Sequence, residues 1–183
     1  NAQKITDLGI FLLTNIGNLF TARKIHNFTG LSLDSIKDYL SYLEDAYLVT
    51  TVNHFSYSLK ETSQLSKKSY AGDGGLRNIV GYRFSQDVGR LAENCVCAEL
   101  KRRGKEIYYW KEKGEVDFVV KDKNKLAGIN VSYTDEVDNR EVKSLLEFRK
   151  KSKKAEELLV LTRDYEAKKE GVVFMPLWKW LLQ

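Results

Sequence analysis

The fold is decided by residues 85–133, which read SQDVGRLAENCVCAELKRRGKEIYYWKEKGEVDFVVKDKNKLAGINVSY. Residues 85–104 predict an amphipathic helix that Gly104 ends, because apolar residues recur there at helical spacing. The side chains expected to face the core are Val88, Leu91, Cys95 and Ala98. Three strand-like runs follow, separated by charged or glycine-containing turns: 106–110, 115–120 and 126–133.

The same alternation of helix and strand continues to the end of the chain. We expect a helix over 138–151, strands over 158–162 and 171–175, and a short apolar helix, PLWKWLL, over 176–182. The order from residue 84 is therefore helix, three strands, helix, strand. This order predicts an α/β (α+β) domain over residues 84–183.

The preceding residues predict a smaller helical unit. A first helix carries the stripe Leu8, Phe11, Leu12 and Ile16. Thr21 opens a second helix that ends near Gly30, and Ser32 or Asp34 can cap a third. The β-branched run at 49–55 and a second run at 68–71 supply two strands of a hairpin. Three helices and a hairpin predict a winged helix-turn-helix domain over residues 1–75.

The motif GDGG at 72–75 is interpreted as a turn. Glycine would supply positive φ there, and Asp73 can bond to nearby backbone. No Lys-Ser or Lys-Thr follows, so the motif is not a P-loop.

Composition places the chain among globular proteins and locates its positive charge. Its 183 residues are 43% hydrophobic and 30% charged, which excludes wholesale disorder. The net charge is +5, and the excess lies entirely after residue 60. Two basic clusters could bind nucleic acid, but solvated helix ends are the favoured interpretation, because cations commonly end helices and complement their dipole. The candidates are Lys101, Arg102, Arg103, Lys105, Lys143, Lys150 and Lys151. The second cluster also contains Arg149, Lys153 and Lys154.

The third predicted helix has an acidic exposed face, so we expect the winged helix to contact protein rather than DNA. Its charged residues are Asp34, Asp38, Glu44, Asp45 and a single Lys37.

Cysteine content and hydropathy suggest a cytoplasmic protein. Cys95 and Cys97, with His26 and His54, are too few for a structural zinc site, so we expect reduced, buried thiols. No apolar run is long enough for a membrane span, and the first residues do not resemble a signal peptide. Because the chain begins with Asn1, we expect a piece of a longer protein.

Two carboxylates are candidate metal ligands. Glu93 is the charged residue of an otherwise uncharged helical row, and Asp117 interrupts an apolar strand. Glu93 could equally extend to solvent from the edge of the packed helix face. A buried carboxylate is costly unless it is paired or binds a metal. Mg²⁺ or Mn²⁺, which oxygen atoms ligate, would be the expected ion.

The predicted αβββαβ order resembles the core of the restriction-endonuclease-like, or PD-(D/E)XK, nucleases. By that resemblance Glu93 and Asp117 are metal ligands, and the (D/E)xK motif falls at residues 130–132. Asn130 replaces the acid and Ser132 replaces the lysine. Hydrolysis would therefore need a cation from elsewhere, with Lys143 or Arg140 as candidates.

The whole chain resembles the C-terminal region of a family of archaeal and bacterial AAA-type ATPases. The matching segments are YLSYLEDAYLV (39–49), YAGDGGL (70–76), GRLAENCV (89–96), YYWKEKGEVDFVV (108–120) and VVFMPLWKWLL (172–182). The resemblance implies an upstream AAA domain that binds ATP in the parent protein. For this chain it implies an accessory region without an ATP cofactor of its own.

The leading hypothesis is therefore a catalytically degenerate nuclease-like module that binds DNA, RNA or, through the winged helix, a protein partner. The alternative is an active Mg²⁺- or Mn²⁺-dependent DNA nuclease with a migrated lysine or arginine. A third possibility is a regulatory dimer formed through the apolar residues 177–182. We expect instead that Trp178, Leu181 and Leu182 seal the core.

Overall fold

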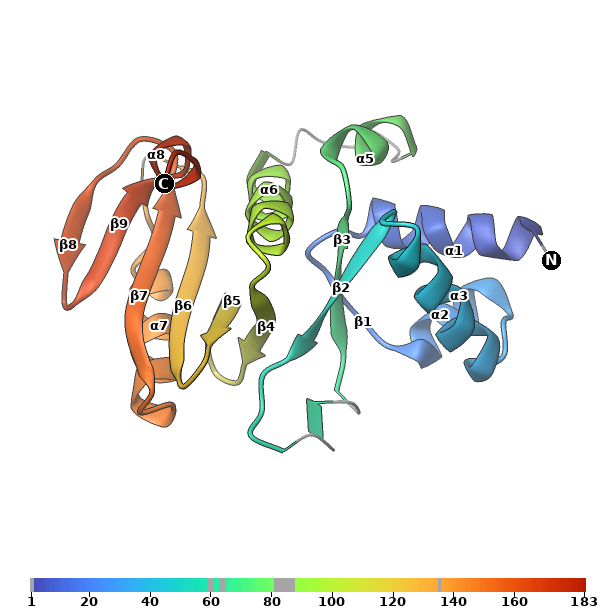
Figure 1. Cartoon of the computed structure of the whole chain (residues 1–183), viewed down its shortest axis with the longest axis horizontal. Helices are drawn as coiled ribbons and strands as arrows, with labels where there is room; N and C mark the ends of the chain where they lie inside the picture. The colour runs from blue at the N-terminus through green and yellow to red at the C-terminus, as the bar shows by residue number, and fades with distance from the viewer. Residues whose placement is uncertain (1, 59–60, 63–64, 81–87, 135) are drawn as a thin grey trace.

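The computed structural model describes residues 2–58, 61, 62, 65–80, 88–134 and 136–183, and it is a mixed α/β structure (Figure 1). Within these residues, nine strands form one sheet in the order β1-β3-β2-β4-β5-β6-β7-β9-β8. The strands are β1 (Leu19–Phe20), β2 (Val49–His54), β3 (Lys67–Ala71), β4 (Glu106–Lys111), β5 (Glu115–Asp122), β6 (Lys125–Ser132), β7 (Ala155–Thr162), β8 (Ala167–Lys169) and β9 (Val172–Pro176). The helices are α1 (Ala2–Thr14), α2 (Ala22–Thr29), α3 (Leu33–Asp45), α5 (Gly74–Val80), α6 (Val88–Arg102), α7 (Asn139–Lys151) and α8 (Leu177–Leu181).

The predicted helices and hairpin of the N-terminal region are present. Thr21 caps α2, with its Oγ1 accepting from Lys24 N at 3.2 Å, and Gly30 ends that helix at φ 66°. Ser32 rather than Asp34 caps α3, accepting from Ser35 N at 3.1 Å. Strands β2 and β3 pair antiparallel, and the short β1 adds to the outer edge of β3.

The motif at residues 72–75 differs from the predicted turn. A bend at Gly72 and Asp73 leads directly into α5, whose Gly75 N donates to Asp73 Oδ1 at 2.6 Å. The glycines of this motif do not have positive φ, so that reason for their presence was wrong. Gly72 is required for space, because a Cβ there would lie 1.8 Å from the Tyr47 carbonyl oxygen.

The C-terminal region has the predicted order of elements, and β8 is an additional strand. Strands β4, β5 and β6 are antiparallel neighbours, whereas β6, β7 and β9 are parallel. Helix α7, capped by Asp138, connects β6 to β7 and packs on one face of the sheet. Helices α6 and α8 pack on the other face, against Phe118, Ile129 and Leu161.

The buried face of α6 is not the one predicted. Val88 is 46% exposed and Cys95 is exposed, whereas Val96, Cys97 and Leu100 are buried. The predicted and the observed buried rows of α6 are both rich in apolar residues, so periodicity alone did not identify the buried row. The contacts of the neighbouring Glu93 and Asn94 decide the orientation of the helix. Both cysteines are free thiols, as expected, but burial was correct for Cys97 alone. Residues 85–87 of this predicted helix lie outside the described residues.

Of the three side chains predicted to seal the core at the end of the chain, Leu181 packs against the core, whereas Trp178 and Leu182 do not. Leu177 and Trp180 are buried, whereas Trp178 is 56% exposed and Leu182 is 81% exposed. A five-residue helix can bury one row, and that row contains Leu177 and Trp180.

The two predicted domains contribute to the same sheet. Asn53 and His54 of β2 register in parallel with Tyr108 and Tyr109 of β4. Figure 1 shows helices α1–α3 at one end of the molecule and β7–β9 at the other. The division into residues 1–75 and 84–183 stays a prediction, and residue 84 lies outside the described part of the chain. No helix in the described part is long and apolar enough to cross a membrane.

Candidate functional site

A buried lysine lies where the two regions of the chain meet. Lys68 is the second residue of β3, and its side chain is 2% exposed. Strand alternation directs Lys68 and Tyr70 towards α6, whereas Ser69 bonds to the Leu12 carbonyl of α1. The position of Lys68 therefore follows from the pairing of β3 within the N-terminal region.

Three carboxylates of the C-terminal region surround this ammonium. Lys68 Nζ lies 3.1 Å from Glu93 Oε1, 2.8 Å from Glu115 Oε1 and 3.0 Å from Asp117 Oδ1. Glu93 and Asp117 are 14% and 18% exposed, and Glu115 is 34% exposed. We call Lys68, Glu93, Glu115 and Asp117 the lysine cluster. It brings together both predicted metal ligands with two residues that sequence analysis had not identified as part of the site.

Glu93 is enclosed by residues of the N-terminal region. Tyr70 Oη donates to Glu93 Oε1 at 2.5 Å. Gly17, at φ 71°, donates its N–H to Ser69 O at 2.8 Å, and a Cβ there would lie 3.2 Å from Glu93 Oε2. A larger residue at position 17 would therefore crowd the carboxylate.

The adjoining Asn94 makes a neutral contact between the regions. Its side chain is buried and bonds to both backbone groups of Ala71, accepting from N at 2.7 Å and donating to O at 3.2 Å. Helix α6 thus presents consecutive residues, Glu93 and Asn94, to consecutive residues of β3.

Asp117 reaches Lys68 because β5 is irregular at this point. The register between β4 and β5 shifts, with Tyr108 opposite Val119 and Trp110 opposite Val116. Val116 and Val119 both pack in the core beneath α7, while Phe118 packs beneath α6. A bulge of this kind redirects side chains, and here it places Asp117 beside the lysine. Val131 N also donates to Asp117 Oδ2 at 3.0 Å.

Asn130 uses its side-chain amide within the protein. Its Oδ1 accepts from Asp117 N at 3.1 Å, and its Nδ2 donates to Glu141 Oε2 at 2.7 Å and to Glu115 O at 3.3 Å. Asn130 therefore joins β5, β6 and α7, and these contacts explain its burial.

The crowding of charge shifts several pKa values. Burial raises the pKa of Glu93 to about 7, aided by Asp117 and opposed by Lys68 and Tyr70. Burial alone would lower the pKa of Lys68, but Asp117, Glu93 and Glu115 together raise it well above its ordinary value. Burial, with Asp117, raises the pKa of Glu141. Lys68 therefore keeps its charge at neutral pH, whereas Glu93 titrates near neutrality.

The other predicted catalytic residues lie farther from the lysine. Ser132 is half-buried in β6 opposite Thr162. Arg140 is 77% exposed and donates to Glu141 Oε1 at 3.1 Å, so it reaches the site only through Glu141 and Asn130. Lys143 is exposed on α7. The structure thus places Lys68, rather than Arg140 or Lys143, against the predicted metal ligands.

The described part of the chain does not offer a preformed metal site. No group of three or more His, Cys, Asp or Glu side chains there is arranged to hold a metal ion. The carboxylates of the lysine cluster converge on an ammonium, so these residues do not fit a metal as they stand. The sequence gives one weak signal for Lys68, its alternation with Tyr70 in a predicted strand, but this signal does not identify the partners of the lysine.

Several residues of the predicted basic clusters have intramolecular partners. Glu99 accepts from both Arg102 and Arg103 at 2.6 Å, and these bonds lower the pKa of Glu99 to about 2. Arg103 also lies over the Trp180 ring at 4.4 Å. Lys151 pairs with Glu112, while Lys101 and Lys150 are exposed.

The turn between β5 and β6 connects the two basic clusters. Lys105 pairs with Asp122 at 3.0 Å, and Lys154 donates to Asn124 Oδ1 at 2.7 Å. The clusters therefore approach each other at one end of the sheet.

Comparison with known proteins assigns the chain to a family. Residues 88–180 match the family model described as "Domain of unknown function (DUF4143)", and residues 1–87 match "Domain of unknown function (DUF8612)". An uncharacterized protein, MJ1544, of Methanocaldococcus jannaschii is 32% identical over all of this chain and 45% of its own length. An uncharacterized protein of Haemophilus influenzae is 28% identical over 95% of this chain and 44% of its own. The chain spans less than half the length of these relatives, and it belongs to the DUF4143 family.

Proposed function

With membership of this family as the premise, we propose that the chain is a catalytically silent, nuclease-like accessory region of an AAA-type ATPase. DUF4143 is often found at the C-terminus of AAA ATPases. The length of the relatives leaves room for a further domain in proteins of this kind. The accessory region would bind nucleic acid or a protein partner while the ATPase domain performs the work.

The arrangement of elements supports two named units. The order α1-β1-α2-α3-β2-β3, with β1, β3 and β2 antiparallel, is the order expected of a winged helix. The order α6-β4-β5-β6-α7-β7, with two antiparallel pairings followed by a parallel one, is the order expected of a restriction-endonuclease-like core. Both assignments belong to the proposal.

The observation that carries the proposal is the position of the Lys68 ammonium. It lies within 3.1 Å of three carboxylates, the groups that would otherwise be expected to hold a divalent ion. Mg²⁺ binds carboxylates at about 2.1 Å and requires open positions for water, which a buried ammonium does not leave. Lys68 thus supplies the positive charge that the carboxylates need. Without a bound metal ion, we do not expect metal-dependent phosphodiester hydrolysis.

The third family position supports the same conclusion. All three described hydrogen bonds of the Asn130 side chain go to protein groups. An amide committed in this way contributes to joining β5, β6 and α7 rather than to ligating a cation.

Cleavage assays test this proposal directly. Plasmid and single-stranded substrates are incubated with the purified chain and Mg²⁺ or Mn²⁺, beside the Asp117→Ala variant. We expect intact substrates in every lane. Cleavage by the wild-type chain that Asp117→Ala abolishes would overturn the proposal.

A second candidate is an active nuclease in which Lys68 is the migrated catalytic lysine. It is favoured by one observation, the direct contact of Lys68 with Glu93 and Asp117. In that case the wild-type chain cleaves DNA, and Lys68→Met abolishes cleavage while Lys67→Met does not. Under the leading proposal neither variant changes a background rate, and calorimetry detects Mn²⁺ binding only when Lys68 is replaced.

A further inference from the structure

A concavity lies beside the β5–β6 turn, at the end of the sheet where the basic clusters approach each other. Its volume is about 240 Å³. Three aromatic rings and several lysines line it, among them Phe55, Tyr57, Tyr108, Lys121, Lys123 and Lys154. No acidic side chain is among the described residues that line it. We call it the aromatic-lysine groove.

The aromatic side chains of the groove are fixed by one another. Tyr57 packs edge-to-face on Phe55, with ring centroids 5.3 Å apart at 74°, and Phe55 packs similarly on Tyr108 at 5.8 Å. Tyr108 Oη also donates to Glu106 Oε1 at 2.5 Å. Because Tyr57 is 68% exposed, it offers ring surface to a ligand without rearrangement of its neighbours.

The lysines of the groove can be made available to a ligand. Lys154 bonds to the neutral Asn124, and Lys123 is exposed at the turn with φ 51°. Lys121 pairs with Glu106 at 3.1 Å, but both side chains are more than 40% exposed, at 44% and 49%. Exposed pairs of this kind contribute little free energy, so a phosphate can replace the carboxylate.

Three carboxylates lie outside the lining of the groove but pair with residues within it. Glu61 accepts from Ser56 at 2.7 Å, Glu106 from Tyr108 and Lys121, and Glu156 pairs with Lys125 at 2.7 Å. The lining itself therefore combines ring surface with positive charge, and these are the two features that single-stranded nucleic acid requires.

We propose that the aromatic-lysine groove binds single-stranded nucleic acid, with a base against Tyr57 and phosphates beside Lys123 and Lys154. The inference rests on the proposed function, because it names the ligand class of the accessory region. Unstacked bases pack on aromatic rings, whereas a duplex covers their faces and is too wide for this cavity. The lysines that line the groove, Lys121, Lys123 and Lys154, can together contact more than one phosphate, which favours a strand with several phosphates over a lone nucleotide.

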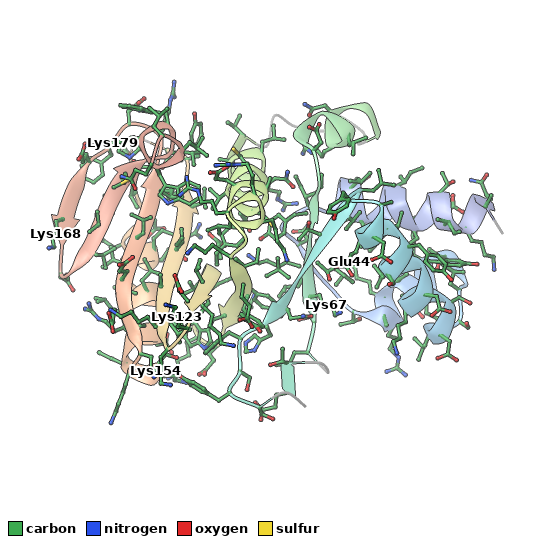
Figure 2. The ribbon with its side chains drawn as sticks, viewed as in Figure 1. Glu44, Lys67, Lys123, Lys154, Lys168 and Lys179 are labelled. Atoms are coloured by element: carbon green, nitrogen blue, oxygen red, sulfur yellow. The ribbon has the colours of Figure 1, made fainter. Side chains whose placement is uncertain are left out.

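Fluorescence anisotropy with labelled oligothymidylate and oligouridylate of about twelve nucleotides tests the proposal. The variants are Tyr57→Ala and Lys154→Glu. Their matched controls are Tyr42→Ala, whose side chain is 59% exposed on α3, and Lys168→Glu on β8. In Figure 2, Lys123 and Lys154 lie at the same end of the sheet, and Lys168 lies at its outer edge.

We expect each groove variant to weaken binding about tenfold, from loss of stacking or of a phosphate contact. Lys154→Glu should also reduce the salt dependence between about 50 and 200 mM, whereas Tyr57→Ala should not. The controls should bind within about twofold of the wild-type chain.

Three results would overturn the inference: no binding of either oligonucleotide, equal weakening by groove and control variants, or a free nucleotide binding as tightly as the strands. None of these results bears on the role proposed for the lysine cluster. The metal-binding and cleavage assays test that role separately. Conversely, metal-dependent cleavage by the wild-type chain would overturn the proposed function, while the groove variants would still report on strand binding.

Discussion

The N-terminal region (residues 2–80) and the C-terminal region (88–183) contribute buried charges of opposite sign. The N-terminal core is apolar, yet the region directs one buried lysine, Lys68, away from that core. The C-terminal region encloses an acidic site whose three carboxylates lie 2.8–3.1 Å from the lysine. Neither region neutralises its own buried charge. The contact between the two regions therefore contributes to the stability of each.

The largest expected effect comes from removing the shared charge. Lys68→Met leaves three partly buried carboxylates without their cation, so we expect the free energy of unfolding at pH 7 to fall by about 3–5 kcal/mol. Urea denaturation measures this change. Lys67→Met, in which the neighbouring lysine is replaced, should cost less than about 0.5 kcal/mol. Equal effects of the two substitutions would show that the lysine cluster does not join the regions.

A smaller effect is expected at the neutral contact between the regions. Asn94→Ala leaves the N–H and C=O of Ala71 without their partners, so we expect a loss of about 2 kcal/mol. Asn27→Ala, at an exposed position of α2, should change stability by less than about 0.5 kcal/mol. If Asn94→Ala proves as mild as its control, charge alone couples the two regions.

Titration of Glu93 gives a further measure of the charge that the two regions share. Because the folded-state pKa of Glu93 is raised to about 7, the folded chain binds more protons than the unfolded chain above pH 4.5. The stability contributed by this group is therefore complete below pH 4.5 and is lost as pH rises through 7. The slope is at most about 1.4 kcal/mol per pH unit.

Denaturation midpoints measured from pH 5 to 8, at about half-unit steps, should show this decline in the wild-type chain. Glu93→Gln should flatten it, since Lys68, Tyr70 and the other carboxylates face an uncharged amide in that variant. A decline that persists unchanged in Glu93→Gln would assign the titration to another group.

The smallest effect is expected for an ion pair that lies within one region. Lys105 and Asp122 pair at 3.0 Å, but their side chains are 37% and 61% exposed. We expect Asp122→Asn to leave the midpoint of urea denaturation almost unchanged, because an exposed pair contributes little to stability. A larger loss would mean that surface pairs, and not the buried cluster alone, stabilise the C-terminal region.

The helices and strands could be predicted from the sequence better than their mutual orientation. Local signals sufficed for the longer strands, for Thr21 at the start of α2 and for a cap of α3 at Ser32 or Asp34, since these depend on neighbouring residues. Strand β8 escaped notice because three residues carry little periodicity. The prediction of the buried face of α6 was wrong because two rows of this helix are rich in apolar residues.

Two of the four residues of the lysine cluster could be predicted, because sequence patterns reveal local features but not long-range contacts. Glu93 and Asp117 were identified because each carboxylate interrupts an apolar pattern that is visible locally. Lys68 was missed because its partners are 25 and 49 residues away, and because Lys67 beside it looks the same in sequence. Long-range pairing of β3 against α6 distinguishes the two lysines, and no local pattern encodes that pairing.

The parallel pairing of β2 with β4 has a consequence for how the chain melts. Its register joins Asn53 to Tyr108 and His54 to Tyr109, which is a narrow connection between the two halves of a long sheet. Such a connection alone would let each half melt independently, giving two heat-absorption peaks. The contacts of Lys68 with the three carboxylates oppose independent melting. A calorimeter should therefore record one peak whose van't Hoff enthalpy equals the calorimetric enthalpy. The chain would then behave as one cooperative folding unit, despite matching two family models.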